Sequence, residues 1–203
     1  MPNPNDNKSK LLKLLHEKSV FFGNFKLSSG ATSDYYVDCK LTTLNPEGAL
    51  LVGQVLYEII DKKARSLGIK IDAVGGLTMG ADPVALAIGL ASRSRNPNDY
   101  YQVFSVRKGA KTHGQNKLIE GNFQQGYRVA VIDDVVTRGD STLQAIDAVE
   151  QAGGSVEFVV ALVDRQEGGR QKIEAKGYAV LSAFNKSDIL QTEEGSRLYN
   201  TQF

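Results

Sequence analysis

The sequence predicts an α/β protein with a mainly parallel central sheet flanked by helices. Short apolar runs alternate with longer amphipathic segments through most of the 203 residues, which is the order of β-α-β units. The run VAVI at 129–132 is continuously apolar, as is typical of strands covered on both faces. No internal repeat or linker interrupts the pattern, so we expect a single domain over residues 1–203.

The N-terminal part is expected to form a small cap over one end of the domain, contributed by residues 1–40. Residues 1–9 are polar and rich in Pro and Asn, so we expect them to fray. A short helix follows near 10–18, where leucines alternate with lysines. Two short strands are expected within 25–40, separated by a Ser-Ser-Gly turn.

The next helix is bounded by clear signals. Asn45 can cap its first turn, Pro46 suits the first helical position, and Gly68 ends it. The remaining elements follow in alternation. We expect strands at 71–75, 100–106, 129–132, 156–163 and 178–184, with helices at 82–92 and 141–152.

Composition excludes several classes of protein. The 24 basic and 23 acidic residues leave a net charge of +1, which argues against a protein built mainly to bind nucleic acid or membranes. The single cysteine, Cys39, excludes an internal disulfide and a cysteine-based zinc site. No apolar run approaches the ~18 residues of a membrane span, and the N-terminus lacks the apolar core of a signal peptide. We therefore expect a cytoplasmic protein.

The segment VAVIDDVVTRGDSTLQAI, at 129–146, carries the clearest chemical signal. Two carboxylates, Asp133 and Asp134, follow an apolar strand, and a loop with a glycine and three hydroxyls then opens a helix. Unpaired N–H groups at a helix start favour a phosphate, whereas carboxylates suit ribose hydroxyls or Mg²⁺. The combination indicates a phosphorylated sugar. The alternative is that the acids end a strand and Gly139 makes a tight turn. The glycine patterns of P-loop and Rossmann enzymes are absent.

A second signal is a basic segment between Asp99 and Glu120 that contains no acid. It holds four fixed positive charges, at Arg107, Lys108, Lys111 and Lys117, together with His113. A mobile cationic loop near a phosphate site suits closure over a diphosphate. The alternative is an ordinary solvated basic face.

Four segments of the sequence are similar to motifs of known enzyme families. Segment 129–146 resembles the phosphoribosyl diphosphate (PRPP) signature of the type I phosphoribosyltransferases. Three further segments are similar to those of the orotate phosphoribosyltransferase family: F-x-L-x-S-G followed by Tyr-Tyr over 25–36, R-K-x-x-K-x-H-G over 107–114, and D-R-Q-E over 164–167. The resemblance implies the type I phosphoribosyltransferase fold, with residues 1–40 as its hood.

The resemblance also implies an activity, a cofactor and an assembly. A Mg²⁺-dependent pentosyltransferase would transfer ribose 5-phosphate from PRPP to orotate, giving orotidine 5′-monophosphate and diphosphate in the de novo synthesis of UMP. Mg²⁺ would be held mainly through the substrate, without a dedicated set of protein ligands. The protein would be a homodimer in which the mobile loop of one subunit reaches the PRPP site of the other.

The site residues implied by the resemblance fall into three groups. The catalytic residues would be Lys111, His113, Asp133 and Asp134. PRPP would be bound by Arg107, Lys108, Lys111, His113, Asp133, Asp134, Val135, Val136, Thr137, Arg138, Gly139, Asp140, Ser141 and Thr142. Orotate would be bound by Thr137, Arg165, Tyr35 and Tyr36. For Arg165 the alternative is a structural ion pair with Glu167 or Asp164.

Two positions depart from the family pattern. Ser28 and Met79 stand where some relatives carry lysines that contact the diphosphate, and Lys26 does not inherit that role by proximity. Neutralising the diphosphate is therefore left to the mobile loop. Two other functions stay open: a purine-salvage phosphoribosyltransferase, which shares the PRPP signature but not the basic loop, and a non-catalytic regulator that binds nucleic acid. The regulator would need a fused DNA-binding domain or a broad basic face.

Overall fold

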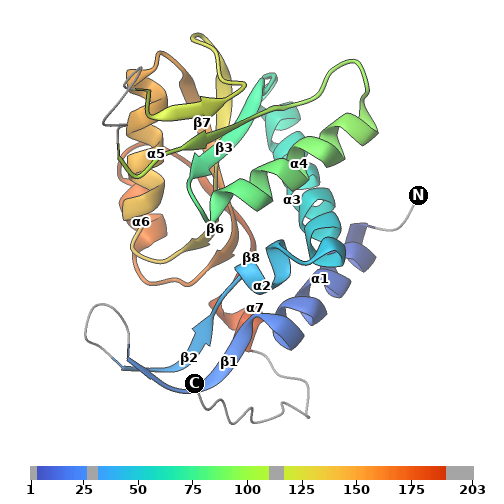
Figure 1. The fold of residues 1–203 in the computed structure, drawn as a ribbon, viewed down its shortest axis with the longest axis vertical. Coiled ribbons are helices and arrows are strands. Elements are labelled where there is room, and N and C mark those ends of the chain that lie inside the picture. Colours follow the sequence, from blue (N-terminus) through green and yellow to red (C-terminus); the bar gives the residue numbers. More distant parts are fainter. Residues whose placement is uncertain (1–3, 27–31, 110–116, 191–203) are drawn as a thin grey trace.

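The computed structural model describes residues 4–26, 32–109 and 117–190, in which helices cover both faces of a central sheet (Figure 1). The sheet has six strands in the order β5-β4-β3-β6-β7-β8. These strands are β3 (Ala73–Leu77), β4 (Gln102–Val106), β5 (Ile119–Gly121), β6 (Arg128–Val136), β7 (Ser155–Asp164) and β8 (Val180–Asn185). All neighbouring pairs are parallel except β4 with β5. The predicted fold class is confirmed.

Within the described residues, the remaining elements are a two-stranded hairpin and seven helices. The hairpin consists of β1 (Val20–Lys26) and β2 (Thr32–Val37), and it lies beyond the lower end of the sheet in Figure 1. The helices are α1 (Pro4–Lys18), α2 (Lys40–Thr43), α3 (Pro46–Leu67), α4 (Ala81–Arg95), α5 (Asp140–Gln151), α6 (Gly169–Glu174) and α7 (Lys186–Leu190).

The two faces of β6 pack against different helices. Ala130 and Ile132 belong to the core cluster that includes the buried side chains of α1, α3 and α4. Val129 and Val131 belong to the second cluster, with the buried side chains of α5. Successive side chains of a strand point to opposite faces, so the adjacent Asp133 and Asp134 near the end of this strand also point to different helical layers.

Helix α3 begins and ends where the sequence predicts. The Asn45 side chain accepts a hydrogen bond from the backbone N–H of Gly48 at 3.1 Å, and Pro46 occupies the first helical position. Gly68 ends the helix with φ of 64°, a left-handed conformation that glycine adopts without a steric penalty.

Three expectations need correction. Residues 4–9 do not fray but belong to α1, where Lys10 pairs with Asp6 at 2.6 Å and the buried Asn7 amide donates to Gln54 of α3. The strand expected at 129–132 continues to Val136, because its ladder with β7 extends to Asp164. The short elements α2, β5, α6 and α7 were not predicted, since a few residues are too short to show periodicity.

Candidate functional site

The acidic pair lies at the carboxyl end of β6. Asp133 accepts a 2.5 Å hydrogen bond from the Thr142 hydroxyl on α5, so the hydroxyl that was expected to face phosphate contacts the acid instead. Asp134 lies on the other face, against Gly80 at the start of α4. A Cβ at Gly80 would come within 2.6 Å of Asp134 Cγ, so this position has no room for a side chain.

The environment of Asp133 changes its ionisation. Burial raises the pKa of the Asp133 carboxyl to about 7, and the negative charge of Asp134 acts in the same direction. The hydrogen bond from Thr142 opposes both effects. Near neutral pH the pair therefore holds less than two full negative charges.

This pKa makes stability depend on pH. The folded-state pKa lies above the ordinary value of 3.8, so the contribution of Asp133 to stability is fully present below about pH 4 and is lost as pH rises through about 7. We expect Asp133→Asn, which keeps an acceptor for Thr142, to unfold about 2–4 °C above the unaltered protein at pH 8 and to show no such gain at pH 4. Thermal unfolding without ligands measures this. An identical difference at both pH values would contradict the assignment.

The loop after β6 is held in place by the segment after β7. Gly139 has φ of 79°, and a Cβ there would lie 3.0 Å from the carbonyl oxygen of Gly169. The Gly169 N–H donates to the Thr137 carbonyl at 2.9 Å. Helix α5 begins directly after Gly139, so its first N–H groups lack helical acceptors and are suited to a phosphate.

Asp140 is the first residue of α5, and two cations offset its charge. Lys172 of α6 forms an ion pair with it, and Arg138 Nε lies 3.9 Å from its Oδ2. The hydrogen bond from Lys172 lowers the pKa of Asp140 below its usual value. Asp140 therefore stays ionised and paired at the start of α5.

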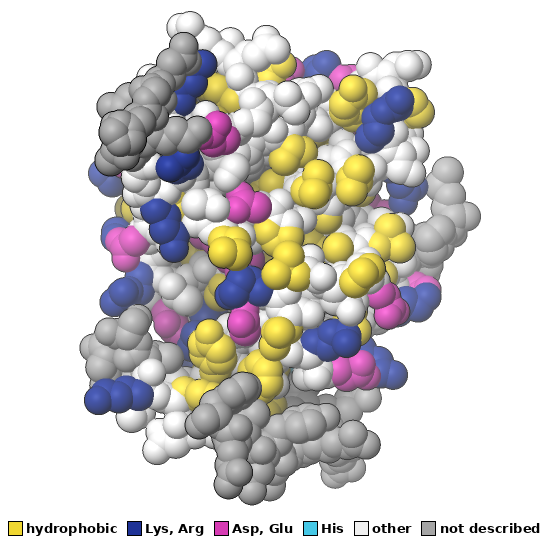
Figure 2. All heavy atoms as spheres, viewed as in Figure 1, with side chains coloured by type: hydrophobic (Ala, Val, Ile, Leu, Met, Phe, Trp, Pro, Cys, Tyr) yellow, Lys and Arg dark blue, Asp and Glu magenta, His cyan; other side chains and the backbone are white. Residues whose placement is uncertain are grey.

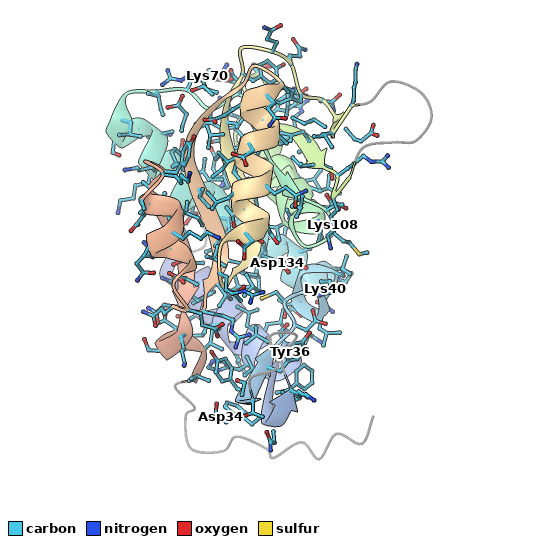
Figure 3. The ribbon with its side chains drawn as sticks, turned by 90° about the vertical axis from the view of Figure 1, so that its left-hand side faces the viewer. Asp34, Tyr36, Lys40, Lys70, Lys108 and Asp134 are labelled. Carbon is cyan, nitrogen blue, oxygen red and sulfur yellow. The ribbon has the colours of Figure 1, made fainter. Side chains whose placement is uncertain are left out.

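The basic segment begins at the end of β4. Arg107 Nη1 lies 3.4 Å from Glu120 Oε1, and the Lys108 carbonyl accepts a bond from Gln144 of α5. Figure 3 shows Lys108 and Asp134 on the same side of the molecule, near the carboxyl ends of β4 and β6. Lys111 and His113, the two catalytic candidates of this segment, lie outside the described residues.

Arg165, which follows β7 directly, lies against the hairpin. Its side chain is only 8% exposed, its Cζ sits 4.8 Å from the centre of the Tyr35 ring, and its Nη2 lies 2.8 Å from Glu167 Oε1. The predicted alternative of an ion pair with Glu167 is thus present. Arg165 Nε and the Tyr35 hydroxyl are both buried without a hydrogen-bond partner among the described residues. These two polar groups are suited to a polar ligand.

The two neighbouring tyrosines do not share an environment. Tyr35 is buried beneath Arg165, whereas Tyr36 is exposed and its ring packs 5.7 Å from that of Phe25. Among the positions that depart from the family pattern, Met79 and Lys26 are exposed, and Ser28 lies outside the described residues.

Sequence reasoning missed Lys40, which lies between Asp134 and Tyr36 (Figure 3). Its Nζ is 2.7 Å from Asp38 Oδ1, and this hydrogen bond raises the pKa of Lys40. The signal that could have found it is the D-C-K run at 38–40, which follows the paired tyrosines after Val37.

Asp82, at the start of α4, was also missed. Its carboxylate accepts hydrogen bonds from Thr78 at 2.6 Å and from Ser105 at 2.5 Å. Asp82 thereby joins the turn before α4 to the end of β4, where the basic segment starts. No local pattern marks the contact with Ser105, because Ser105 lies on β4 and is 23 residues from Asp82 in the chain.

Proteins of known function resemble this chain over most of its length. It is 44% identical to the orotate phosphoribosyltransferase of Aquifex aeolicus over 187 residues, which cover 90% of this chain and 97% of that protein. It is 43% identical to the corresponding enzyme of Streptomyces avermitilis, covering 91% and 97% of the two chains. No protein-family model matches the chain.

Comparison with solved structures agrees with the comparison of sequences. The crystal structure of Mycobacterium tuberculosis orotate phosphoribosyltransferase in complex with PRPP has a TM-score of 0.73 and 36% identity, covering 90% of this chain and 98% of that one. Adenine phosphoribosyltransferase from Leishmania donovani, at a TM-score of 0.60 and 16% identity, shares the fold alone. None of the helices that the structure describes is long and apolar enough to cross a membrane.

Proposed function

The chain belongs to the orotate phosphoribosyltransferase family, and on that premise we propose that Asp133 and Asp134 bind the ribose of PRPP while Arg165 binds orotate. The reaction transfers ribose 5-phosphate from PRPP to orotate, yielding orotidine 5′-monophosphate and diphosphate in pyrimidine synthesis. One observation carries the proposal. The acids lie near the carboxyl end of β6, Arg165 follows β7, and these strands are neighbours with Val136 paired to Asp164.

The chemistry of PRPP explains the acids. The bond between ribose C1 and the diphosphate oxygen breaks with positive charge developing on the ring. Carboxylates at Asp133 and Asp134 accept hydrogen bonds from the ribose hydroxyls and stabilise that charge. We place the 5′-phosphate at the start of α5, where the first backbone N–H groups lack helical acceptors.

Orotate brings a planar carboxylate and imide, and Arg165 is suited to them. A guanidinium is planar and always charged, so it binds such groups in a fixed geometry. The unpartnered Nε of Arg165 supplies a donor, and Thr137 lies on the adjoining loop. The Tyr35 ring lies against the guanidinium of Arg165, and Figure 3 shows Lys40 between Asp134 and Tyr36.

The leaving diphosphate gathers negative charge as the bond breaks. From the sequence pattern we assign Lys111 and His113 to neutralise or protonate its leaving oxygen, with Arg107 and Lys108 adding charge. Mg²⁺, when bound, supplies further neutralisation of the diphosphate. Carboxylates of the Asp133–Asp134 pair are suitable hard ligands, and Mg²⁺ usually takes one or two such groups together with substrate oxygens.

A spectrophotometric assay tests the proposed function. Purified protein with PRPP, Mg²⁺ and orotate should lose orotate absorbance, and excess chelator should stop the loss. Adenine, guanine and xanthine serve as competing acceptors, because a purine-salvage enzyme would prefer one of them. Folded protein that leaves orotate unchanged would overturn the central assignment, whereas turnover that persists in chelator would overturn only the role of Mg²⁺.

We propose a homodimer, supported by an apolar surface on one side of the molecule. Figure 2 shows hydrophobic side chains gathered on the face that carries α4. Leucines of α2, α3 and α4 are 48–64% exposed: Leu41, Leu50, Leu86 and Leu90. Leu50, Ala87 and Leu90 also line a hollow of about 290 Å³. An apolar patch of this kind is typical of an interface.

The free, buried thiol of Cys39 accords with a reducing compartment, so we place the enzyme in the cytoplasm.

Complementation tests whether each site is shared between subunits. Asp134→Asn should inactivate the PRPP site of its own subunit, and Lys111→Ala should inactivate the loop that serves the partner. Mixed dimers then contain one site in which both groups are intact. We expect activity to return towards about a quarter of the normal value after mixing, from the statistics of random pairing. Two inactive proteins that exchange subunits yet never complement would exclude shared sites.

A further inference from the structure

We propose that Arg170 is a positioning residue for orotate. It positions the guanidinium of Arg165 through Asp164 and the turn at Gln166. This inference rests on the proposed role of Arg165. It adds a residue from α6 that the sequence motifs do not mark and that does not itself contact the ligand position.

Arg170 is held by partners on two neighbouring strands. Its Nε donates to Asp164 Oδ2 at 2.7 Å, and its Nη1 donates to the carbonyl of Val180 at 2.6 Å. Its Nη2 lies 3.3 Å from the Ser182 hydroxyl. The guanidinium therefore connects the end of β7 to the start of β8, and a rigid fork of donors is required to reach all three acceptors at once.

Asp164 transmits this restraint to the next two residues. Its side chain is 3% exposed, and its second oxygen, Oδ1, accepts the backbone N–H of Gln166 at 2.8 Å. Gln166 has φ of 55°, a left-handed conformation that is unfavourable for a residue with a side chain. The bond from Asp164 stabilises that turn in the manner of an Asx-turn.

The turn determines where the Arg165 side chain lies. The Arg165 backbone N–H continues the sheet by donating to the Val136 carbonyl at 3.0 Å, so its main chain is fixed on one side. On the other side the chain reverses at Gln166, which brings Glu167 within 2.8 Å of Arg165 Nη2. If the turn relaxes, Arg165 loses both this partner and its place over Tyr35.

Replacing Arg170 should therefore affect orotate and spare PRPP. Without its cation, Asp164 is a buried carboxylate with a single remaining partner, which weakens the turn. We expect Arg170→Gln to raise the KM for orotate about five- to twentyfold and to leave the KM for PRPP within about twofold. A merely structural arginine would lower the unfolding temperature without this split between the two substrates.

Arg128→Gln is the matched control. Arg128 also makes a two-point pair, with Nε 2.8 Å from Glu157 Oε1 and Nη2 3.2 Å from Oε2, but it lies at the first residue of β6, at the far end of the sheet from the site. We expect it to leave both KM values unchanged. Arg170→Lys is the second variant if Arg170→Gln does not fold. A lysine cannot reach the three acceptors together, so its orotate KM should lie between those of the unaltered protein and Arg170→Gln.

The double variant Arg165→Gln/Arg170→Gln distinguishes the role of Arg170 from the proposed role of Arg165, on which it depends. With Arg165 replaced, adding Arg170→Gln should raise the orotate KM no further. If Arg165→Gln alone leaves orotate unaffected, the proposed role of Arg165 fails. If Arg165→Gln raises the orotate KM but folded Arg170 variants do not, or if they raise the KM of both substrates equally, the role of Arg170 is overturned.

Discussion

Gly80→Ala is expected to lower kcat/KM for PRPP by about 100-fold without unfolding the protein. Gly80 has ordinary helical angles, φ −63° and ψ −43°, so alanine introduces no backbone strain. The added methyl group would instead overlap the carboxylate of Asp134 and displace it. A displacement of about 1 Å in a group that positions substrate can cost this much in rate. Steady-state kinetics with varied PRPP measure the effect.

The double variant Gly80→Ala/Asp134→Asn provides the control. If Gly80 matters only because it leaves room for Asp134, the double variant should be no slower than Asp134→Asn alone. Thermal unfolding should show that Gly80→Ala remains folded. Losses that multiply in the double variant, or full activity in Gly80→Ala, would show that the contact with Asp134 is not the cause.

Arg165→Gln is expected to raise the KM for orotate about 10- to 100-fold while the KM for PRPP stays nearly constant. A hydrogen bond to a charged group contributes about 1.5–3 kcal/mol, and each 1.4 kcal/mol corresponds to a factor of ten. Glutamine keeps part of the side-chain volume over Tyr35, which limits the loss of packing. The measurement is a pair of KM values, one for each substrate.

Glu167→Gln tests the structural alternative for the same arginine. This change removes the ion pair at 2.8 Å but leaves the guanidinium in place. If Arg165 acts on orotate, Glu167→Gln should disturb orotate binding much less than Arg165→Gln does. If the arginine serves only the ion pair, the two variants should behave alike and should damage both substrates equally.

Much of the fold could be predicted because its signals are local. The capping of α3 by Asn45 and Gly68 depends on residues within the helix and its ends. The buried strand β6 and the glycine that opens α5 are likewise contained in one short segment. The residues at which helices and strands begin and end were harder to predict from the sequence. The sequence did not show that α1 starts at Pro4, because Asn7 is held by Gln54 of a different helix.

For the site, the sequence alone determined which residue types were available: an acidic pair after an apolar run, a glycine-containing turn before a helix, a basic segment and an arginine after the next strand. It identified the family through these motifs, which are short and continuous. The uneven distribution of charge along the chain was also visible there, despite a net charge of only +1.

Only the tertiary structure decided how those residues are arranged. It turned Asp133 towards Thr142 and Asp134 towards Gly80, buried Tyr35 while exposing Tyr36, and brought Arg170 to Asp164. The physical reason is that hydrogen bonds, steric overlap and burial depend on distances between elements that lie far apart in the chain. A motif records which groups are present, and the packing of helices on the sheet determines which atoms each group contacts.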